Sequence, residues 1–250
     1  MNNSLNAMEN KNKFSIDFVI LGISFIIGVI IFTAAWKSNQ KSNQTIMVTG
    51  SAKKEIVSDL AIFRGTIFVQ SSSASSAYSE LNRQKPIIIS YLEQKSFPKD
   101  KIEFSTISSY PVYEIGPNGY QTSKIIGYVY NQRIELKSED VYKIKELSLD
   151  IASLIEKGID FRVEPPEYHY TKIADLKIEI QAEAAKDAMV RAKKIADATD
   201  RDLGPMRSAR MGVLQITPKF SNAVSDYGIN DLSSIEKEIV GVVTASFQIE

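Results

Sequence analysis

The chain has 250 residues, of which 44% are hydrophobic and 24% are charged, a globular composition that allows one large domain or two small ones. Lysine plus arginine and aspartate plus glutamate each number 30, so the formal net charge is zero. This balance argues against a dedicated nucleic-acid-binding protein, which carries a basic excess. The absence of cysteine excludes thiol catalysis, cysteine-ligated zinc, disulfides and lipid attachment through a thiol.

The N-terminal region contains a long apolar segment. Val19–Ala35 has no charged residue, and an aromatic neighbour on each side extends it to a length that just crosses a bilayer core. Because it is apolar all round, it differs from the amphipathic helix of a soluble domain. We predict a transmembrane signal anchor at residues 18–36, with a cytoplasmic tail at residues 1–17 and a linker at residues 37–45.

Two alternatives to the anchor remain open. A cleavable signal peptide would be cut near Thr33–Ala35, where small residues follow the apolar run. A buried helix of a soluble domain is the third interpretation. With an anchor or a signal peptide, the rest of the chain lies outside the cytoplasm, which in a bacterium means the periplasmic side of the cell membrane.

The first half of the folded region begins with strands. Apolar residues predict a short strand at residues 46–50 and a long alternating one at residues 56–70. The serine-rich stretch Ser71–Ser76 could supply a nucleophile or a phosphate loop, but neither Gly-x-Ser-x-Gly nor a glycine-rich loop accompanies it. We therefore predict that serine caps a helix at residues 74–94, which Pro86 should kink or break.

A β-hairpin is predicted next. Residues 102–114 and 125–136 have strand composition, and Gly116–Gly119 between them is typical of a turn. Tyrosine is frequent here, which is explained either by a binding surface or subunit interface or by strand propensity alone. The tyrosines in question are Tyr110, Tyr113, Tyr120, Tyr128 and Tyr130.

A second helix and an interrupted strand follow. Residues 141–157 have one apolar face and end before a glycine, and a cap is available at Ser138–Asp140. Residues 160–170 predict a strand that is interrupted at Pro165–Pro166, which places this strand at an edge or a bulge.

The last part of the chain contains the longest helix, at residues 171–199. Most of its apolar face is alanine, and small side chains let a helix lie close to a sheet. The face consists of Ile173, Leu176, Ile180, Ala184, Ala188, Ala192, Ile195 and Thr199. Strands at residues 206–216 and 239–249 close the chain, and the polar residues 217–236 between them predict a long mobile loop.

The predicted elements form a pseudo-repeat. Two β-α-β-β units, at residues 46–137 and 158–250, are joined by the helix at residues 141–157. Each unit places a helix on an antiparallel sheet with one apolar face. The predicted fold class is α+β, with two such units and an N-terminal transmembrane helix.

Several local motifs, in this order, resemble the SIMPL domain family, which includes the bacterial periplasmic immunogenic proteins and the stress-linked YggE-like proteins. The motifs are IMVTGSA from Ile46, Asp59-Leu60-Ala61, the alanine-rich helix Ala182–Ala198 running into Leu203-Gly204, and the closing strand Val240–Phe247. The likeness covers about residues 44–250. The chain departs from the family at Ser58, where proline is frequent, and at Asp200, where glycine is frequent, which leaves the geometry of the helix end open.

The resemblance implies an extracytoplasmic α+β protein. Some relatives form large ring-like or barrel-like oligomers, and members are linked to protection from oxidative stress without an agreed reaction. The family offers no catalytic residues to transfer, and we expect no catalytic, cofactor-binding or metal-binding residues and no cofactor.

Isolated polar residues were weighed as sites. His169 has only Glu164 and Glu167 as nearby acids, and Glu167 could point to the same side of a strand. Two ligands make a poor metal site, so a surface or hydrogen-bonded histidine is expected. Four acids in or beside the long loop lack calcium-loop spacing and are interpreted as solvated charge; they are Asp226, Asp231, Glu236 and Glu238. The sequon Asn43-Gln44-Thr45 is attributed to chance.

Two functional hypotheses follow. The first is a membrane-anchored extracytoplasmic protein that acts in oxidative or envelope stress defence by self-assembly, as a homo-oligomer, or by binding a protein partner, and not as an enzyme. The second is a small-ligand-binding or enzymatic domain, with a pocket between sheet and helices gated by the loop at residues 217–236. A convergent polar cluster around His169 would favour the second.

Overall fold

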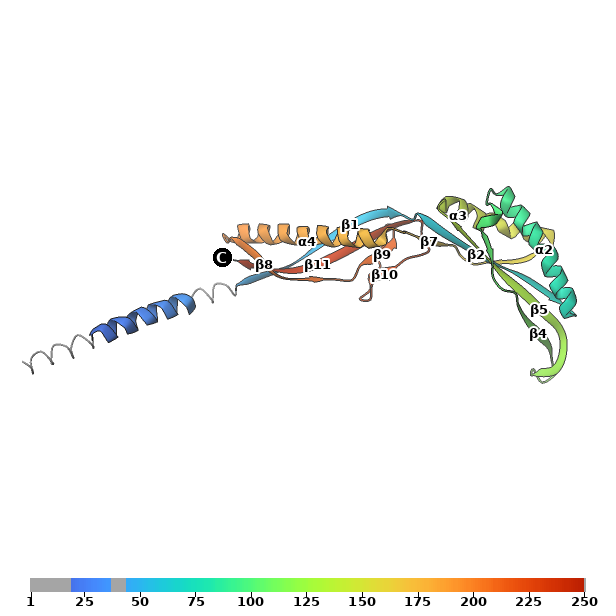
Figure 1. Cartoon of the computed structure of the whole chain (residues 1–250), viewed down its shortest axis with the longest axis horizontal. Helices are drawn as coiled ribbons and strands as arrows, with labels where there is room; N and C mark the ends of the chain where they lie inside the picture. Colours follow the sequence, from blue (N-terminus) through green and yellow to red (C-terminus); the bar gives the residue numbers. More distant parts are fainter. Residues whose placement is uncertain (1–18, 37–43, 250) are drawn as a thin grey trace, which may run out of the picture. The chain divides into compact units, whose positions relative to one another are not determined.

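The computed structural model describes residues 19–36 and 44–249. After an N-terminal apolar helix it contains two β-sheets packed with helices (Figure 1). The helices are α2 (Ala74–Gln94), α3 (Val141–Asp150) and α4 (Ile173–Ala198), with short 3-10 helices at Lys99–Lys101 and Ile151–Lys157. The strands are β1 (Thr45–Val57), β2 (Leu60–Ser71), β3 (Ile102–Phe104), β4 (Ser108–Ile115), β5 (Gln121–Ser138), β6 (Asp160–Val163), β7 (Glu167–His169), β8 (Leu203–Met211), β9 (Gln215–Pro218), β10 (Ile229–Asn230) and β11 (Glu236–Ile249). The predicted α+β class is confirmed.

The chain divides into two compact units. The first consists of the chain up to Ser51, Ala182–Gly212 and the chain from Val242, and the second of Ala52–Gln181 and Val213–Gly241. Strands β1 and β11 and helix α4 each contribute residues to both units.

The second unit contains a six-stranded sheet in the order β3-β5-β2-β6, in which β4 also pairs with β5 and β7 with β2. All of these pairs are antiparallel. Burial alternates along β2, and its buried residues form one core with α2 and α3. The largest fully buried side chains of this core include Phe63, Ile67, Leu81, Ile88, Ile134 and Ile144. Burying each of them contributes about 2 kcal/mol.

Helix α2 begins at a serine cap and passes through a proline. The Ser73 hydroxyl accepts a hydrogen bond from the backbone N–H of Ser76 at 3.1 Å, which confirms the capping interpretation. Pro86 lies inside the helix, which continues to Gln94, so a break at this proline is wrong. A proline removes one backbone donor, but the burial of α2 against the sheet holds the helix together.

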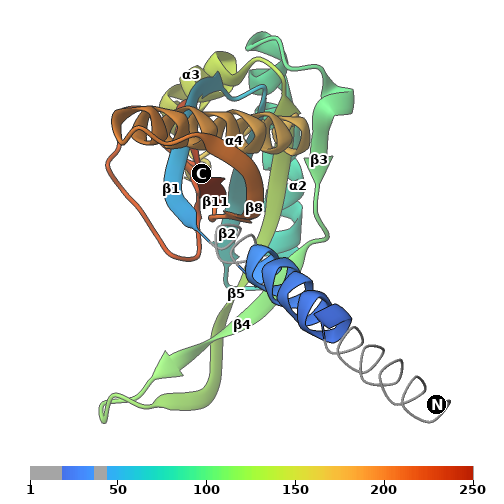
Figure 2. The same cartoon turned by 90° about the vertical axis from the view of Figure 1, so that its left-hand side faces the viewer.

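Strands β4 and β5 form the predicted hairpin, and its tip is two-stranded. Pairing between β2 and β5 ends at Ser71 and Tyr128. Pairing between β4 and β5 continues beyond this point, from Val112 opposite Gly127 to Ile115 opposite Gln121. We call residues 112–127 the hairpin arm; Figure 2 shows it extending beyond the end of β2.

In the first unit, α4 covers one face of β1, β11 and β8 (Figure 2). The helix residues that face the sheet are alanines at most 1% exposed: Ala184, Ala188, Ala192 and Ala196. The predicted close packing of an alanine face on a sheet is confirmed. Ile195, predicted on this face, is 45% exposed, because Ala196 occupies the inward position instead.

The five-stranded sheet has the order β1-β11-β9-β10, and β8 also pairs with β11. Its part in the second unit consists of β9, β10, the start of β11 and the end of β1. Strand β9 pairs antiparallel with β11 and parallel with β10. Below them lies an apolar cluster of Ile56, Leu176, Ile180, Ile216 and Ile239. Because β10 lies within residues 217–236, this segment is not the continuous loop that the sequence predicts.

Three strands that the sequence predicts as continuous are interrupted. Residues 102–114 divide into β3 and β4 at residues 105–107. Residues 56–70 divide between β1 and β2, because the N–H groups of Ser58 and Asp59 donate to the carbonyls of Ile235 and His169, each at 2.9 Å. Residues 206–216 divide into β8 and β9 at residues 212–214.

The predicted order of strand, helix, strand and strand occurs twice along the chain. The first strand of the second succession does not pair within its own succession. Strands β6 and β7, which open the second succession, pair with β2, while β1 takes the place beside β11. The interruption between β6 and β7 falls at Pro165–Pro166, as predicted.

The apolar helix Val19–Trp36 has a mean hydropathy of 2.5 over 18 residues and is not buried against any described part of the chain. By length and composition it could be a signal sequence or a single membrane anchor. The predicted tail at residues 1–17, residues 37–43 of the predicted linker and Asn43 of the sequon lie outside the described residues.

Candidate functional site

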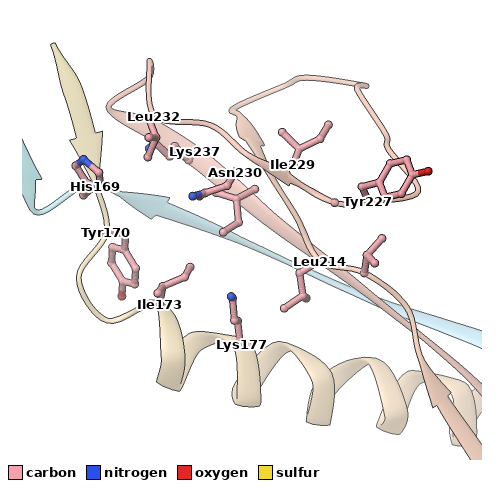
Figure 3. A pocket seen from close by; sticks show the side chains of 13 residues that line it. His169, Tyr170, Ile173, Lys177, Leu214, Tyr227, Ile229, Asn230, Leu232 and Lys237 are labelled. Carbon is pink, nitrogen blue, oxygen red and sulfur yellow. The ribbon is translucent and has the colours of Figure 1, made fainter.

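A pocket of about 470 Å³ lies between the first turns of α4, strand β9 and the segment that carries β10, all in the second unit (Figure 3). Its volume lies within the range of small-molecule sites, roughly 300–1,000 Å³. Apolar side chains form much of its wall, namely Ile173, Val213, Leu214, Ile216, Ile229 and Leu232.

Polar and aromatic side chains enter the same space from several elements. His169 and Tyr170 come from the end of β7, Lys177 from α4, Asn230 from β10 and Lys237 from β11. Figure 3 shows Lys177 rising from the helix toward the wall that carries Asn230. None of the described residues that line the pocket is an aspartate or a glutamate, so the lining is cationic.

Lys237 is the buried member of this group. The residue is 2% exposed, and its Nζ donates hydrogen bonds to the backbone carbonyls of Tyr168 and Asp231, each at 2.5 Å. Burial lowers the pKa of Lys237, and the carboxylate of Asp231 opposes this shift. An ammonium group has three donors, so the two carbonyls leave one N–H for a further acceptor.

His169 belongs to a charged chain beside the pocket. Its Nε2 lies 3.2 Å from Oε2 of Glu167, which confirms the prediction that these two side chains share one side of the strand. Glu167 also pairs with Arg64 at 2.7 Å, and the hydrogen bond from Arg64 lowers the pKa of Glu167. Glu164, the other acid weighed as a partner, pairs with Arg133 instead.

The described lining of the pocket lacks the common nucleophiles. No serine, threonine or cysteine occurs among its described lining residues, so His169 has no nucleophile of these types to activate there. In the described part of the chain, no three or more histidine, cysteine, aspartate or glutamate side chains come together as a metal site would require.

The sequence missed the two lysines and Asn230 as site residues. A signal for Lys237 does exist, because the residue lies between Ile235 and Ile239 on the inward face of an alternating strand. Lys177 and Asn230 have no such signal, since both are exposed and only the fold brings them to one pocket.

The model of one protein family, SIMPL, described as a protein of unknown function (DUF541), matches residues 46–244. The chain belongs to the SIMPL family. A search of curated proteins finds no match.

The acids beside the long loop of this SIMPL protein behave differently from one another. Asp226 and Glu236 are exposed, as predicted. Glu238 is 3% exposed and pairs with Lys53 at 2.5 Å, and Asp231 accepts hydrogen bonds from the N–H groups of a following serine pair. For Glu238 and Asp231 the interpretation as solvated charge is wrong, because β10 and β11 return this segment to the sheet.

A second candidate surface of the SIMPL domain is the hairpin arm. Large apolar side chains of the arm and its base are exposed, namely Tyr110, Ile115, Tyr120, Ile125 and Ile126. The other tyrosines of this region, Tyr113, Tyr128 and Tyr130, are half-buried, and Tyr130 packs edge-on against Tyr78 with ring centroids 6.2 Å apart. Exposed apolar patches of this kind often mark interaction sites.

Proposed function

We propose that this SIMPL protein is held in the bacterial cell membrane by Val19–Trp36, acting as an uncleaved signal anchor, with its domain on the periplasmic side. We propose further that the domain acts by self-assembly or by binding a protein partner, without catalysis. The apolar, fully exposed helix supports the anchor. The family resemblance supports a role in defence against oxidative or envelope stress.

The hairpin arm is the observation that supports self-assembly. A two-stranded hairpin is marginally stable in water when it stands alone, and this arm exposes several large apolar side chains, with Ile115 71% and Tyr120 75% exposed. Contact with a second copy would bury them, at a gain of about 25 cal/mol per Å² of apolar surface. A second copy supplies a matching arm, as a symmetric interface requires.

The assembly is tested by the mass of the full chain in detergent, measured by light scattering with the detergent contribution subtracted. We expect a mass of several chains, and a lower mass for the double variant Ile115→Ser with Tyr120→Ser. The control is Leu149→Ser with Tyr142→Ser, which removes one aliphatic and one tyrosine side chain from exposed positions on α3. A monomeric wild type contradicts self-assembly, and equal masses of both variants exclude the arm as the contact.

The placement is tested separately. The mass of the N-terminal fragment from cells distinguishes the anchor from a signal peptide, which would be absent from the mature protein. Protease added outside spheroplasts should digest the domain when it lies on the periplasmic side, and protection of the domain would refute this orientation.

A second candidate function is the binding of a small molecule in the pocket. The convergence of His169, Lys177 and Asn230 on one space with apolar walls favours it. The segment at residues 217–236 forms one wall, so its movement would control access to the pocket. Ligand-dependent protection of this segment in hydrogen exchange is the expected sign of such gating.

A further inference from the structure

The pocket combines two features that together define a class of ligand. The described residues that line it bring two lysines and no carboxylate, although the whole chain is neutral. A site with one sign of charge and low-dielectric walls concentrates ligands of the opposite charge. The lining therefore disfavours a cationic ligand and favours an anionic one.

The two lysines differ in what they can offer. Lys237 already donates to the carbonyls of Tyr168 and Asp231, and it has one N–H left. Lys177 forms no hydrogen bond or ion pair with the residues that the structure describes, and its ammonium group points from α4 into the pocket, toward Asn230 (Figure 3). Lys177 is thus the residue best placed to pair with an incoming negative charge.

The rest of the pocket is apolar. Ile173 of α4 and Leu214, just before β9, lie on either side of Lys177, and Ile229 of β10 belongs to the opposite wall (Figure 3). A fully hydrated inorganic anion would bury none of this apolar surface. A ligand with a short hydrocarbon body would bury it while its charged end remains with Lys177 and Asn230.

We infer that the pocket binds a small organic anion, with a carboxylate at one end and an apolar body of several carbons. Lys177 pairs with the carboxylate, Asn230 donates to it through its side-chain amide, and the isoleucine and leucine side chains enclose the body. This inference rests on the second candidate function, that the pocket takes a ligand.

The test uses four small probes titrated into the full chain in detergent by calorimetry, with the heat from empty micelles subtracted. The probes are hexanoate, hexanamide, hexylamine and acetate, which separate the charge from the apolar body. We expect hexanoate to bind at millimolar concentration, and each of the other three to bind at least about tenfold more weakly.

A matched pair of variants assigns the charge. Lys177→Gln should weaken hexanoate about tenfold and leave hexanamide unchanged, because it removes the charge and keeps the length of the side chain. Lys172→Gln changes the same charge on an exposed residue just before α4 and outside the pocket lining, and should have no effect.

The outcomes distinguish failure of the anionic ligand class from failure of the proposal that the pocket binds a ligand. Equal binding of hexanoate and hexanamide, or preference for hexylamine, would show a ligand pocket and overturn the anionic class. Loss of hexanoate binding in both lysine variants alike would overturn the role of Lys177. Absence of binding by all four probes would overturn the ligand-binding proposal itself.

Discussion

Gly50 of β1 and Ala188 of α4 meet through their backbones. A Cβ atom built on Gly50 would lie closer to the backbone nitrogen of Ala188 than real Cβ atoms do, and it would also overlap the carbonyl oxygen of Ala184. The φ angle of Gly50 is not in the left-handed region, so close approach and not backbone conformation requires glycine here. The alanine face of α4 and this glycine together set the distance between helix and sheet.

We predict that Gly50→Ala lowers the free energy of unfolding by about 1–3 kcal/mol, because the helix backbone must move to admit one methyl group. Urea unfolding of the full chain, followed by circular dichroism, measures the change. Ser51→Ala is the control, since Ser51 is exposed on the next position of the same strand and its backbone N–H to Asp187 is kept. Equal stability of both variants would show that the backbones of Gly50 and Ala188 are too far apart for an added methyl group to clash.

The end of α4 gives a prediction of opposite sign. Asp200 adopts φ 53°, the left-handed conformation that glycine takes most readily, and the N–H of Arg201 donates to the carbonyl of Ala196 at 2.9 Å. The departure from the family at this position therefore leaves the helix end intact. Asp200→Gly should raise the unfolding free energy by up to about 1 kcal/mol, and Asp200→Val should lower it. A lower midpoint for Asp200→Gly in the same urea experiment would contradict this.

Sequence reasoning succeeded where a local pattern determines the structure. The cap at Ser73, the turn at Gly119 and the alanine face through Ala188 each depend on neighbours within a few residues. It failed where distant backbone groups decide. Ser58 and Asp59 end a strand only because carbonyls more than 100 residues away accept their N–H groups.

The candidate site shows the same limit more strongly. The pairing of Glu167 with His169 follows from strand alternation, and the sequence predicted it. Lys177 lies on the exposed side of a helix, and its position in a pocket depends on β9 and β10, which begin 38 and 52 residues later. The spacing of apolar residues along α4 does not show that a distant segment forms the opposite wall of a pocket.

Arg64 joins the central strand β2 to one paired strand on each side, β5 and β7, and removing it should lower stability in a pH-dependent way. Its guanidinium pairs with Glu135 on β5 at 2.8 Å and Glu167 on β7 at 2.7 Å, and its hydrogen bonds lower the pKa of both carboxylates. A lowered carboxylate pKa stabilises the fold above the ordinary value of 4.5, and this stability is lost as pH falls through the folded pKa.

We therefore expect Arg64→Met to be less stable than the wild type by about 1–2 kcal/mol near neutral pH, a modest amount because all three side chains are partly exposed. The difference should shrink as the pH falls below 4.5. Arg83→Met is the control, because it breaks an exposed ion pair within α2 and should change stability much less than Arg64→Met does. A deficit that does not depend on pH would mean that Arg64 acts through packing alone.

Lys237 should make the free energy of unfolding depend on pH in the alkaline range. Because burial lowers its pKa below the ordinary value of 10.5, the folded protein releases this proton at a lower pH than the unfolded chain does. Between the two pKa values the unfolded chain binds more protons, so the contribution of Lys237 to stability rises with pH and levels off above 10.5. We predict that the wild type gains stability relative to Lys237→Met as the pH is raised toward 10.5.

The variant also loses donors to two carbonyls, but that cost, about 1–3 kcal/mol, is a constant offset and not a slope. Urea unfolding of both proteins at a series of pH values gives the difference, with Lys172→Met as a control at an exposed lysine. A flat difference would show that Lys237 titrates as an ordinary lysine, and a falling one would mean that its charged form is favoured by the fold.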